Sequence, residues 1–103
     1  MPKQYRLSDK ILIKKCAKVG NKKYSNFFIV KKLESINKQF VIVVSKKYDK
    51  RAVGRNLIKR QCKAIIYQNI DIIDSGIYMI IIKNNIQQKN FKDIAKDILS
   101  SLT

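Results

Sequence analysis

Histidine is absent from this sequence of 103 residues, and cysteine occurs only at Cys16 and Cys62. Histidine is the usual general base at neutral pH and a common metal ligand, so many acid–base and metal sites are excluded. The two cysteines form no CxxC pair, and each falls on an apolar face of a predicted helix. This placement indicates buried, reduced thiols and favours neither a disulfide nor a zinc site.

Acidic residues are few and scattered, and no glycine-rich loop that could cradle a phosphate is present. The seven acidic residues are Asp9, Glu34, Asp49, Asp71, Asp74, Asp93 and Asp97. Only Asp71/Asp74 and Asp93/Asp97 can share a helical face, and we interpret Asp93 and Asp97 as solvent-side partners of neighbouring lysines. The three glycines stand alone, and no serine or cysteine has the surroundings of an activated nucleophile. The sequence therefore predicts no catalytic residue and no metal site.

Long apolar runs are also lacking. None approaches the roughly 20 residues that a membrane span requires. The first ten residues, MPKQYRLSDK, contain neither an apolar signal core nor a cleavage site, so we expect a cytoplasmic protein. The basic residues lie on elements that have a core of their own to bury, unlike a free amphipathic anchor, which argues against a membrane surface as the partner.

Positive charge, in contrast, is abundant. The chain has 23 Lys and Arg residues against seven Asp and Glu, a formal net charge of +16, while 46% of its residues are hydrophobic. This length and apolar content predict one folded domain over residues 1–103. Because so large a charge repels itself in a compact state, it favours a polyanionic partner.

The charge is densest in residues 45–68, SKKYDKRAVGRNLIKRQCKAIIYQ. Eight of these 24 residues are Lys or Arg, and only Asp49 is acidic. From about Ala52 onward the spacing is helical, with an apolar arc formed by Val53, Leu57, Ile58, Cys62, Ala64, Ile65 and Ile66. Arg55 lies at the border of the opposite arc, which carries Asn56, Lys59, Arg60, Lys63 and Tyr67. A helix of this kind presents cations to an extended anion, and a nucleic-acid backbone fits best.

The rest of the chain alternates between helical and strand patterns. Ser8 can N-cap a first helix that ends at Gly20-Asn21. Aromatic and β-branched residues predict a strand over residues 24–33, with apolar side chains on both of its faces. A further short strand near residues 19–23 is compatible with the pattern, and a last helix is capped by Asn90.

Two unbroken apolar runs, residues 40–44 and 78–82, are typical of strands buried on both faces, as central strands are. The basic helix lies between them in the sequence. A strand, a helix and a second strand of this kind predict a parallel crossover.

One sequence motif, in the basic helix and just before it, is more specific for a protein family. Arg55-Asn56-Leu57-Ile58-Lys59-Arg60 is preceded by Ala52-Val53 and, further back, by Ser45-Lys46-Lys47. This arrangement resembles the signature of the bacterial ribonuclease P protein subunit, which runs roughly SKK-x-G-x-AV-x-RNR-x-KR. Element order, length and charge agree as well, so the resemblance covers most of the chain.

The sequence departs from that signature in three places. Leu57 stands where the RNR triplet has its second arginine. The connection at residues 48–51 is one residue longer than usual and lacks the glycine. The first helix has Ile13 and Ala17 where the family tends to place phenylalanine.

The resemblance implies a fold and a set of partners. Members of the family fold as an α+β, two-layer α-β sandwich of order αβββαβα, whose β-α-β crossover is left-handed, against the general rule. They bind one large catalytic RNA, and the holoenzyme cuts the 5′ leader from precursor tRNA without an obligatory protein partner. Mg²⁺ bound mainly by the RNA activates the water in that reaction.

The resemblance also assigns two groups of residues. The catalytic RNA is expected to contact Lys46, Lys47, Arg51, Arg55, Asn56, Lys59, Arg60 and Lys63. A cleft between the first helix and the sheet is expected to take the leader, and its residues are Arg6, Ile13, Phe28 and Lys31. Phe28 would stack on a base, while Arg6 and Lys31 would contact phosphates. A core position is the alternative for Phe28, because the strand pattern does not define its face.

Two other functions stay open on the sequence alone. A small RNA-binding module similar to a ribosomal protein would share the charge and the fold class but would have no role in cleavage. A stand-alone nuclease would need a metal or acid–base site on the protein itself.

Overall fold

A computed structural model describes residues 2–44, 50–83 and 91–103 of the chain. The elements, in order, are η1 (Lys3–Tyr5), α1 (Lys10–Val19), β1 (Asn21–Tyr24), β2 (Phe28–Leu33), β3 (Lys38–Val44), α2 (Ala52–Gln68), η2 (Ile70–Ile72), β4 (Gly76–Ile82) and α3 (Phe91–Leu102). The predicted α+β fold of order αβββαβα is therefore confirmed.

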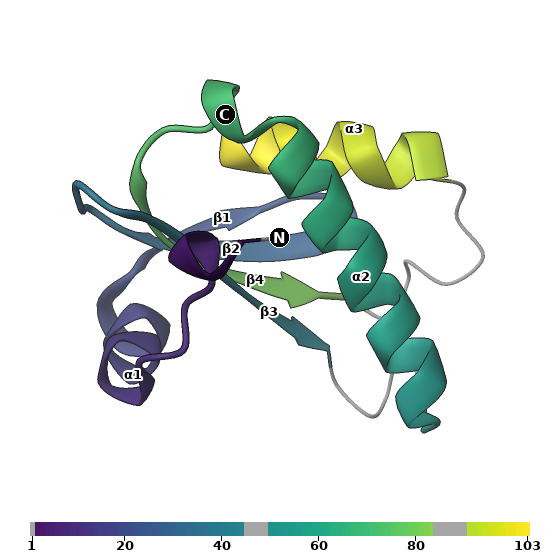
Figure 1. Cartoon of the computed structure of the whole chain (residues 1–103), viewed down its shortest axis with the longest axis horizontal. Helices are drawn as coiled ribbons and strands as arrows, with labels where there is room; N and C mark the ends of the chain where they lie inside the picture. Colours follow the sequence, from purple (N-terminus) through teal and green to yellow (C-terminus); the bar gives the residue numbers. More distant parts are fainter. Residues whose placement is uncertain (1, 45–49, 84–90) are drawn as a thin grey trace.

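The four strands form one sheet in the order β1-β2-β4-β3. Strand β3 pairs with β4 in parallel, as predicted, and the other two pairings are antiparallel. In Figure 1, α2 lies in front of the sheet, β3 and β4 both run from left to right, and β4 lies above β3. The β3–α2–β4 crossover is therefore left-handed, as the resemblance implied and against the usual hand.

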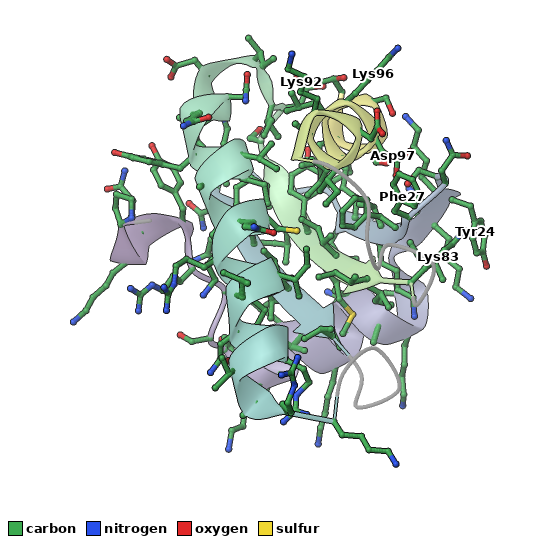
Figure 2. The ribbon with its side chains drawn as sticks, turned by 90° about the vertical axis from the view of Figure 1, so that its right-hand side faces the viewer. Tyr24, Phe27, Lys83, Lys92, Lys96 and Asp97 are labelled. Atoms are coloured by element: carbon green, nitrogen blue, oxygen red, sulfur yellow. The ribbon has the colours of Figure 1, made fainter. Side chains whose placement is uncertain are left out.

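Both faces of the sheet are covered, but unequally. Helices α2 and α3 pack on one face, over the alternate residues Phe28 and Val30 of β2 and Tyr78, Ile80 and Ile82 of β4. Helix α1 packs on the other face, where its Cys16 joins Ile77 of β4 and Leu7. Figure 2 shows α2 and α1 on opposite sides of the sheet. This double covering explains why the strands carry apolar residues on both faces.

Two expectations about the first helix and the first strands need correction. Residues 24–33 do not form one strand, because the chain turns at Ser25–Phe27 and pairs β1 with β2. Asp9, and not Ser8, caps α1, since its carboxylate accepts the main-chain N–H groups of Ile11 and Leu12 at 2.9 and 3.3 Å. The short strand near residues 19–23 does exist, as β1, and the predicted cap at Asn90 lies outside the described residues.

Strand β3 was expected in the middle of the sheet, but it lies at an edge. Residues before α1 protect this edge: Arg6 bridges to Phe40 in parallel, and the N–H of Leu7 donates to the carbonyl of Phe40 at 2.9 Å. This covering helps to bury the edge strand, in which Phe40 and Ile42 are buried and the other residues half-buried, and this burial explains its unbroken apolar run.

Candidate nucleic-acid interface

Helix α2 buries one narrow stripe and exposes the rest. The residues buried against the core are Ile58, Cys62, Ile65 and Ile66. Asn56 and Arg60 are exposed, and Lys59 and Lys63 are half-buried along one side of the helix. No acidic residue occurs between Ala52 and Gln68. The charged side chains on the outer surface of α2 are therefore all positive, and this surface faces away from the sheet.

Val53 and Leu57 do not belong to the buried stripe, contrary to the sequence prediction. Their side chains are 79% and 53% exposed. At 100° per residue both lie nearly opposite Cys62. The apolar arc predicted from the sequence is therefore wider than the surface that α2 buries against the sheet. Leu57 thus occupies the outer surface, one turn before Arg60.

The start of α2 is organised by its arginines. Arg51 is the N-cap residue and is exposed. Arg55 is half-buried, and its Nη1 donates to the carbonyl of Lys50 at 2.9 Å. Arg55 therefore fixes the first turn of the helix in addition to carrying charge. Lys46 and Lys47 lie outside the described residues.

Arg6 lies with the α2 lysines and not in the predicted leader cleft. Together with Lys59 and Lys63 it lines a cavity of about 250 Å³, whose apolar wall includes Phe40 and Ile42. The bridge between Arg6 and Phe40 holds this segment beside α2. Three cations from distant parts of the sequence thus meet around one hollow, an arrangement that suits a phosphate group.

The sheet face beside α1 carries the remaining leader-cleft residues. Ile13 packs against the small core beneath α1. Lys31 is on the same face, but its Nζ donates to the carbonyl of Ala17 at 2.9 Å, near the end of α1. Lys31 therefore holds α1 against the sheet, which limits its role as a phosphate contact.

Phe28 is not on this face. Its side chain is fully buried, in the core between the sheet and helices α2 and α3. A ring in that position cannot reach a nucleobase, so the assignment of Phe28 as the stacking residue is wrong and its alternative, a core aromatic, is correct. The error arose because this strand carries apolar residues on both faces, so the sequence does not show which face points toward the core.

Comparison with known proteins decides the family. The whole chain, residues 1–103, matches the sequence profile of the family Ribonuclease P. The chain belongs to the ribonuclease P protein family. The ribonuclease P protein component of Helicobacter hepaticus is 40% identical over 58 residues, which are 56% of this chain but only 39% of that protein. The component from Pseudanabaena sp. is 29% identical over 106 residues and covers 99% of this chain and 91% of that protein.

Solved ribonuclease P proteins share the fold. The protein from Thermotoga maritima has a TM-score of 0.82 and 23% identity, over 94% of both chains. A Staphylococcus aureus ribonuclease P protein, a mutant with defective mRNA degradation activity, has a TM-score of 0.87 and 22% identity over 95% of this chain and 85% of that one. Membership of the ribonuclease P family implies a part in an endoribonuclease complex and an RNA partner.

The stacking candidate that sequence reasoning missed is Tyr24. It pairs with Ile29 across the β1–β2 hairpin, and Ile29 pairs with Ile81, so all three lie on the α1 face. Tyr24 is 64% exposed, and the Nζ of Lys83 lies 5.9 Å from the centroid of its ring. Recognition of the turn after Tyr24 would have revealed this residue at the end of an exposed strand.

Asp97 also has a different role from the one predicted. It is buried, and its carboxylate accepts hydrogen bonds from the Ser25 hydroxyl at 2.8 Å and from the N–H groups of Asn26 and Phe27 at 3.1 and 2.9 Å. It is therefore no solvent-side partner of a lysine. Asp97 instead attaches α3 to the β1–β2 turn.

The two cysteines are buried free thiols, as predicted. Burial raises the pKa of Cys62 to about 12 and also raises the pKa of Cys16. Thiols that stay protonated at neutral pH are poor nucleophiles. In addition, no helix in the described part of the chain is long and apolar enough to cross a membrane.

Proposed function

We propose that this chain is the protein subunit of a ribonuclease P ribonucleoprotein. In this role it binds the catalytic RNA and the 5′ leader of precursor tRNA, and it assists the Mg²⁺-dependent removal of that leader. The observation that carries the proposal is the outer surface of α2 on a chain of the ribonuclease P family. This 17-residue helix contains four Lys or Arg residues and no acidic side chain. A cytoplasmic location follows from this role.

The catalytic RNA is proposed to lie along α2. Asn56 and Arg60 would contact it from the outer surface, and Lys59, Lys63 and Arg6 would hold a phosphate at the cavity that they line. Each phosphate neutralised by the protein releases counterions, so the protein would replace some of the cations that a folded RNA requires.

The leader is proposed to lie on the α1 face of the sheet. Tyr24, and not Phe28, would supply the exposed ring for base stacking, with Lys83 beside it. The floor of this face is apolar and half-exposed, at Ile29, Ile81 and Val43. An apolar floor bordered by cations suits an unpaired strand better than a duplex, because bases and not only phosphates reach the surface.

The chemistry is proposed to reside in the RNA. Within residues 2–44, 50–83 and 91–103, no three His, Cys, Asp or Glu side chains are grouped so that they could hold a metal ion. We therefore assign none of these residues as a Mg²⁺ ligand. The protein would contribute binding and charge neutralisation only, and it would need no obligatory protein partner.

The decisive experiment reconstitutes the complex. The purified protein is mixed with the ribonuclease P RNA of its own organism and a 5′-labelled precursor tRNA, and cleavage is followed at low Mg²⁺ with and without protein. We expect the protein to restore accurate 5′ cleavage that the RNA alone performs poorly. Tight RNA binding without any effect on cleavage would instead support the ribosomal-protein-like role, and cleavage by the protein alone would support a nuclease.

A further inference from the structure

The turn that joins β1 to β2 carries a second aromatic ring. Phe27 is half-buried and lines a cavity of about 350 Å³, together with Asn26, Asp93, Lys96, Asp97 and Ser100. The inner side of the ring packs against the main core, so its position is fixed by the fold. Figure 2 shows Phe27 beneath α3, near Asp97. A cavity of this size lies within the range of small-molecule sites, and a nucleobase is an occupant of that class.

Phe27 and Tyr24 lie on opposite faces of the sheet but at the same end of it. Tyr24 is on the α1 face, and Phe27 is on the face that α3 covers. Only Ser25 and Asn26 separate them in the chain. Lys83 adjoins both residues, because its Nζ lies 5.9 Å from the centroid of the Tyr24 ring and its main-chain N–H donates to the carbonyl of Phe27. A single-stranded nucleic acid that leaves the α1 face at Tyr24 therefore meets the Phe27 cavity as soon as it passes around the turn.

The turn between the two rings is held rigid. Asp97 accepts three hydrogen bonds from residues 25–27. On the other side, Lys83 donates from Nζ to the carbonyl of Ser25 at 2.7 Å and from its main-chain N–H to the carbonyl of Phe27 at 2.9 Å. The rings are thus preorganised, which lowers the entropic cost of binding a flexible strand.

The charge around the cavity suits a nucleotide. Lys92 and Lys96 are exposed one turn apart on α3, and Lys83 stands beside the turn. The carboxylate of Asp97 is already engaged by three donors, so it presents little unbalanced charge to a ligand. Asp93 also lines the cavity and is exposed, so it offsets part of the charge that the lysines supply. An aromatic floor with lysines at its rim is the composition of sites for single-stranded nucleic acid.

We propose that the hairpin tip, defined as Tyr24, Phe27, Lys83 and Lys96, binds the part of the precursor leader that lies 5′ to the nucleotides on the α1 face. One base stacks on Tyr24, and a base further upstream enters the Phe27 cavity. Lys96 contacts a phosphate beyond the second base, while Lys83 holds the turn between the two rings. This inference rests on the proposed function, since it extends the path of the same leader.

A tryptophan reporter tests the inference directly, because the chain contains no tryptophan. Phe27→Trp places an indole in the cavity, and Ile36→Trp places the control indole at a position that is 95% exposed in the turn between β2 and β3. Each variant is assembled with the catalytic RNA and titrated with precursor tRNAs whose leaders are shortened stepwise from the 5′ end. We expect the Phe27→Trp emission to be quenched by the long leader only, and the Ile36→Trp emission to be insensitive to leader length.

Affinity measurements give an independent test. Phe27→Leu keeps an apolar side chain in the core but removes the stacking surface, and it should weaken binding of the long-leader precursor about five- to tenfold while leaving the shortest-leader precursor unaffected. Lys96→Gln should also weaken binding of the long-leader precursor only. Lys14→Gln, on the outer side of α1, removes the same charge and should not discriminate between leader lengths.

Two results would overturn the inference. One is an unchanged Phe27→Trp emission together with equal effects of Phe27→Leu on long and short leaders. The other is complete quenching by the catalytic RNA before any precursor is added, which would assign the cavity to that RNA. Both are distinct from failure of the proposed function, in which the unmodified protein would not stimulate cleavage of any precursor.

Discussion

The carboxylate of Asp97 in α3 accepts a hydrogen bond of 2.9 Å from the main-chain N–H of Phe27, 70 residues earlier in the chain. The same carboxylate binds Asn26 and Ser25, while the Ser25 hydroxyl accepts the N–H of Phe28 at 3.1 Å. One buried charge thus satisfies the polar groups of the turn and joins the last helix to the first hairpin.

Replacement of Asp97 by asparagine is therefore expected to destabilise the fold. Asn has one acceptor oxygen and a donor NH₂, which would face N–H donors that remain buried. Loss of hydrogen bonds to a charged group costs about 1.5–3 kcal/mol, so we expect a decrease of that order in the free energy of unfolding. Urea denaturation followed by circular dichroism measures it.

The matched control for this change is Asp71→Asn. Asp71 is exposed in η2, and its substitution raises the net charge by the same amount. Changes at such a surface position are usually within about 0.5 kcal/mol. Equal effects of the two substitutions would mean that net charge, and not the turn network, determines the loss.

The buried thiol of Cys62 predicts an alkaline limit to stability. Its pKa in the folded state is about 12, raised by burial from 9.0. Above pH 9 the unfolded chain releases this proton while the folded chain retains it, so the folded state loses stability as pH rises from about 9 to 12. The slope for one proton is about 1.4 kcal/mol per pH unit.

The measurement compares unfolding free energies of the original chain and Cys62→Ala between pH 7 and pH 11. Below pH 8 the two curves should run parallel, separated by the cost of the lost side chain. Above pH 9 they should converge, because the alanine variant lacks the titrating group. All other ionisable groups are the same in both proteins, so their contribution cancels, and curves that stay parallel would contradict the assignment.

Much of the fold could be predicted because its strongest patterns are local. The spacing from Ala52 onward defined α2, and two unbroken apolar runs around it defined the parallel pair β3 and β4. The hairpin was missed because Ser25 and Asn26 interrupt an aromatic and β-branched run only briefly. The left hand of the crossover is a property of the whole sheet, which no local pattern encodes, and only the family resemblance supplied it.

The site was predicted less completely, and for a physical reason. The period of a helix shows which of its side chains lie outside the core, so the positions of Asn56, Lys59 and Arg60 beyond the buried stripe of α2 were predicted. A strand with apolar residues on both faces hides which side chains are exposed, so Phe28 was chosen and Tyr24 was overlooked. The roles of Arg6 and Asp97 depend on contacts with segments that are distant in the sequence. The residues next to them in the sequence do not reveal those contacts.

The α2 surface predicts a specific salt dependence of RNA binding. The double variant Lys59→Gln/Arg60→Gln should reduce the slope of log K against log salt by up to about two phosphate equivalents. Arg55 is left intact because it also holds the first turn of the helix. The control, Lys14→Gln/Lys18→Gln, removes two exposed charges from the outer side of α1 and should leave the slope unchanged. Filter binding to the catalytic RNA over a range of KCl concentrations measures both.

Leu57 allows the opposite change. Because it is 53% exposed on the same surface, Leu57→Arg should insert a cation without disturbing the core. We expect the salt slope to increase by up to about one phosphate equivalent. An unchanged slope in both this variant and the Lys59/Arg60 variant would mean that the RNA does not lie along α2.

Tyr24 provides the sharpest test of leader binding. Because 64% of its side chain is exposed, Tyr24→Leu should leave the stability of the fold nearly unchanged. Loss of one base-stacking contact costs about 1–3 kcal/mol, so the holoenzyme should bind precursor tRNA more weakly by that amount while its affinity for mature tRNA, which has no leader, stays constant. Tyr24→Phe retains the ring and should restore the original affinity, since stacking does not need the hydroxyl. If the Tyr24→Leu and Tyr24→Phe variants bind the precursor equally well, the leader does not stack on Tyr24, and the α1 face contributes to binding through its charge alone.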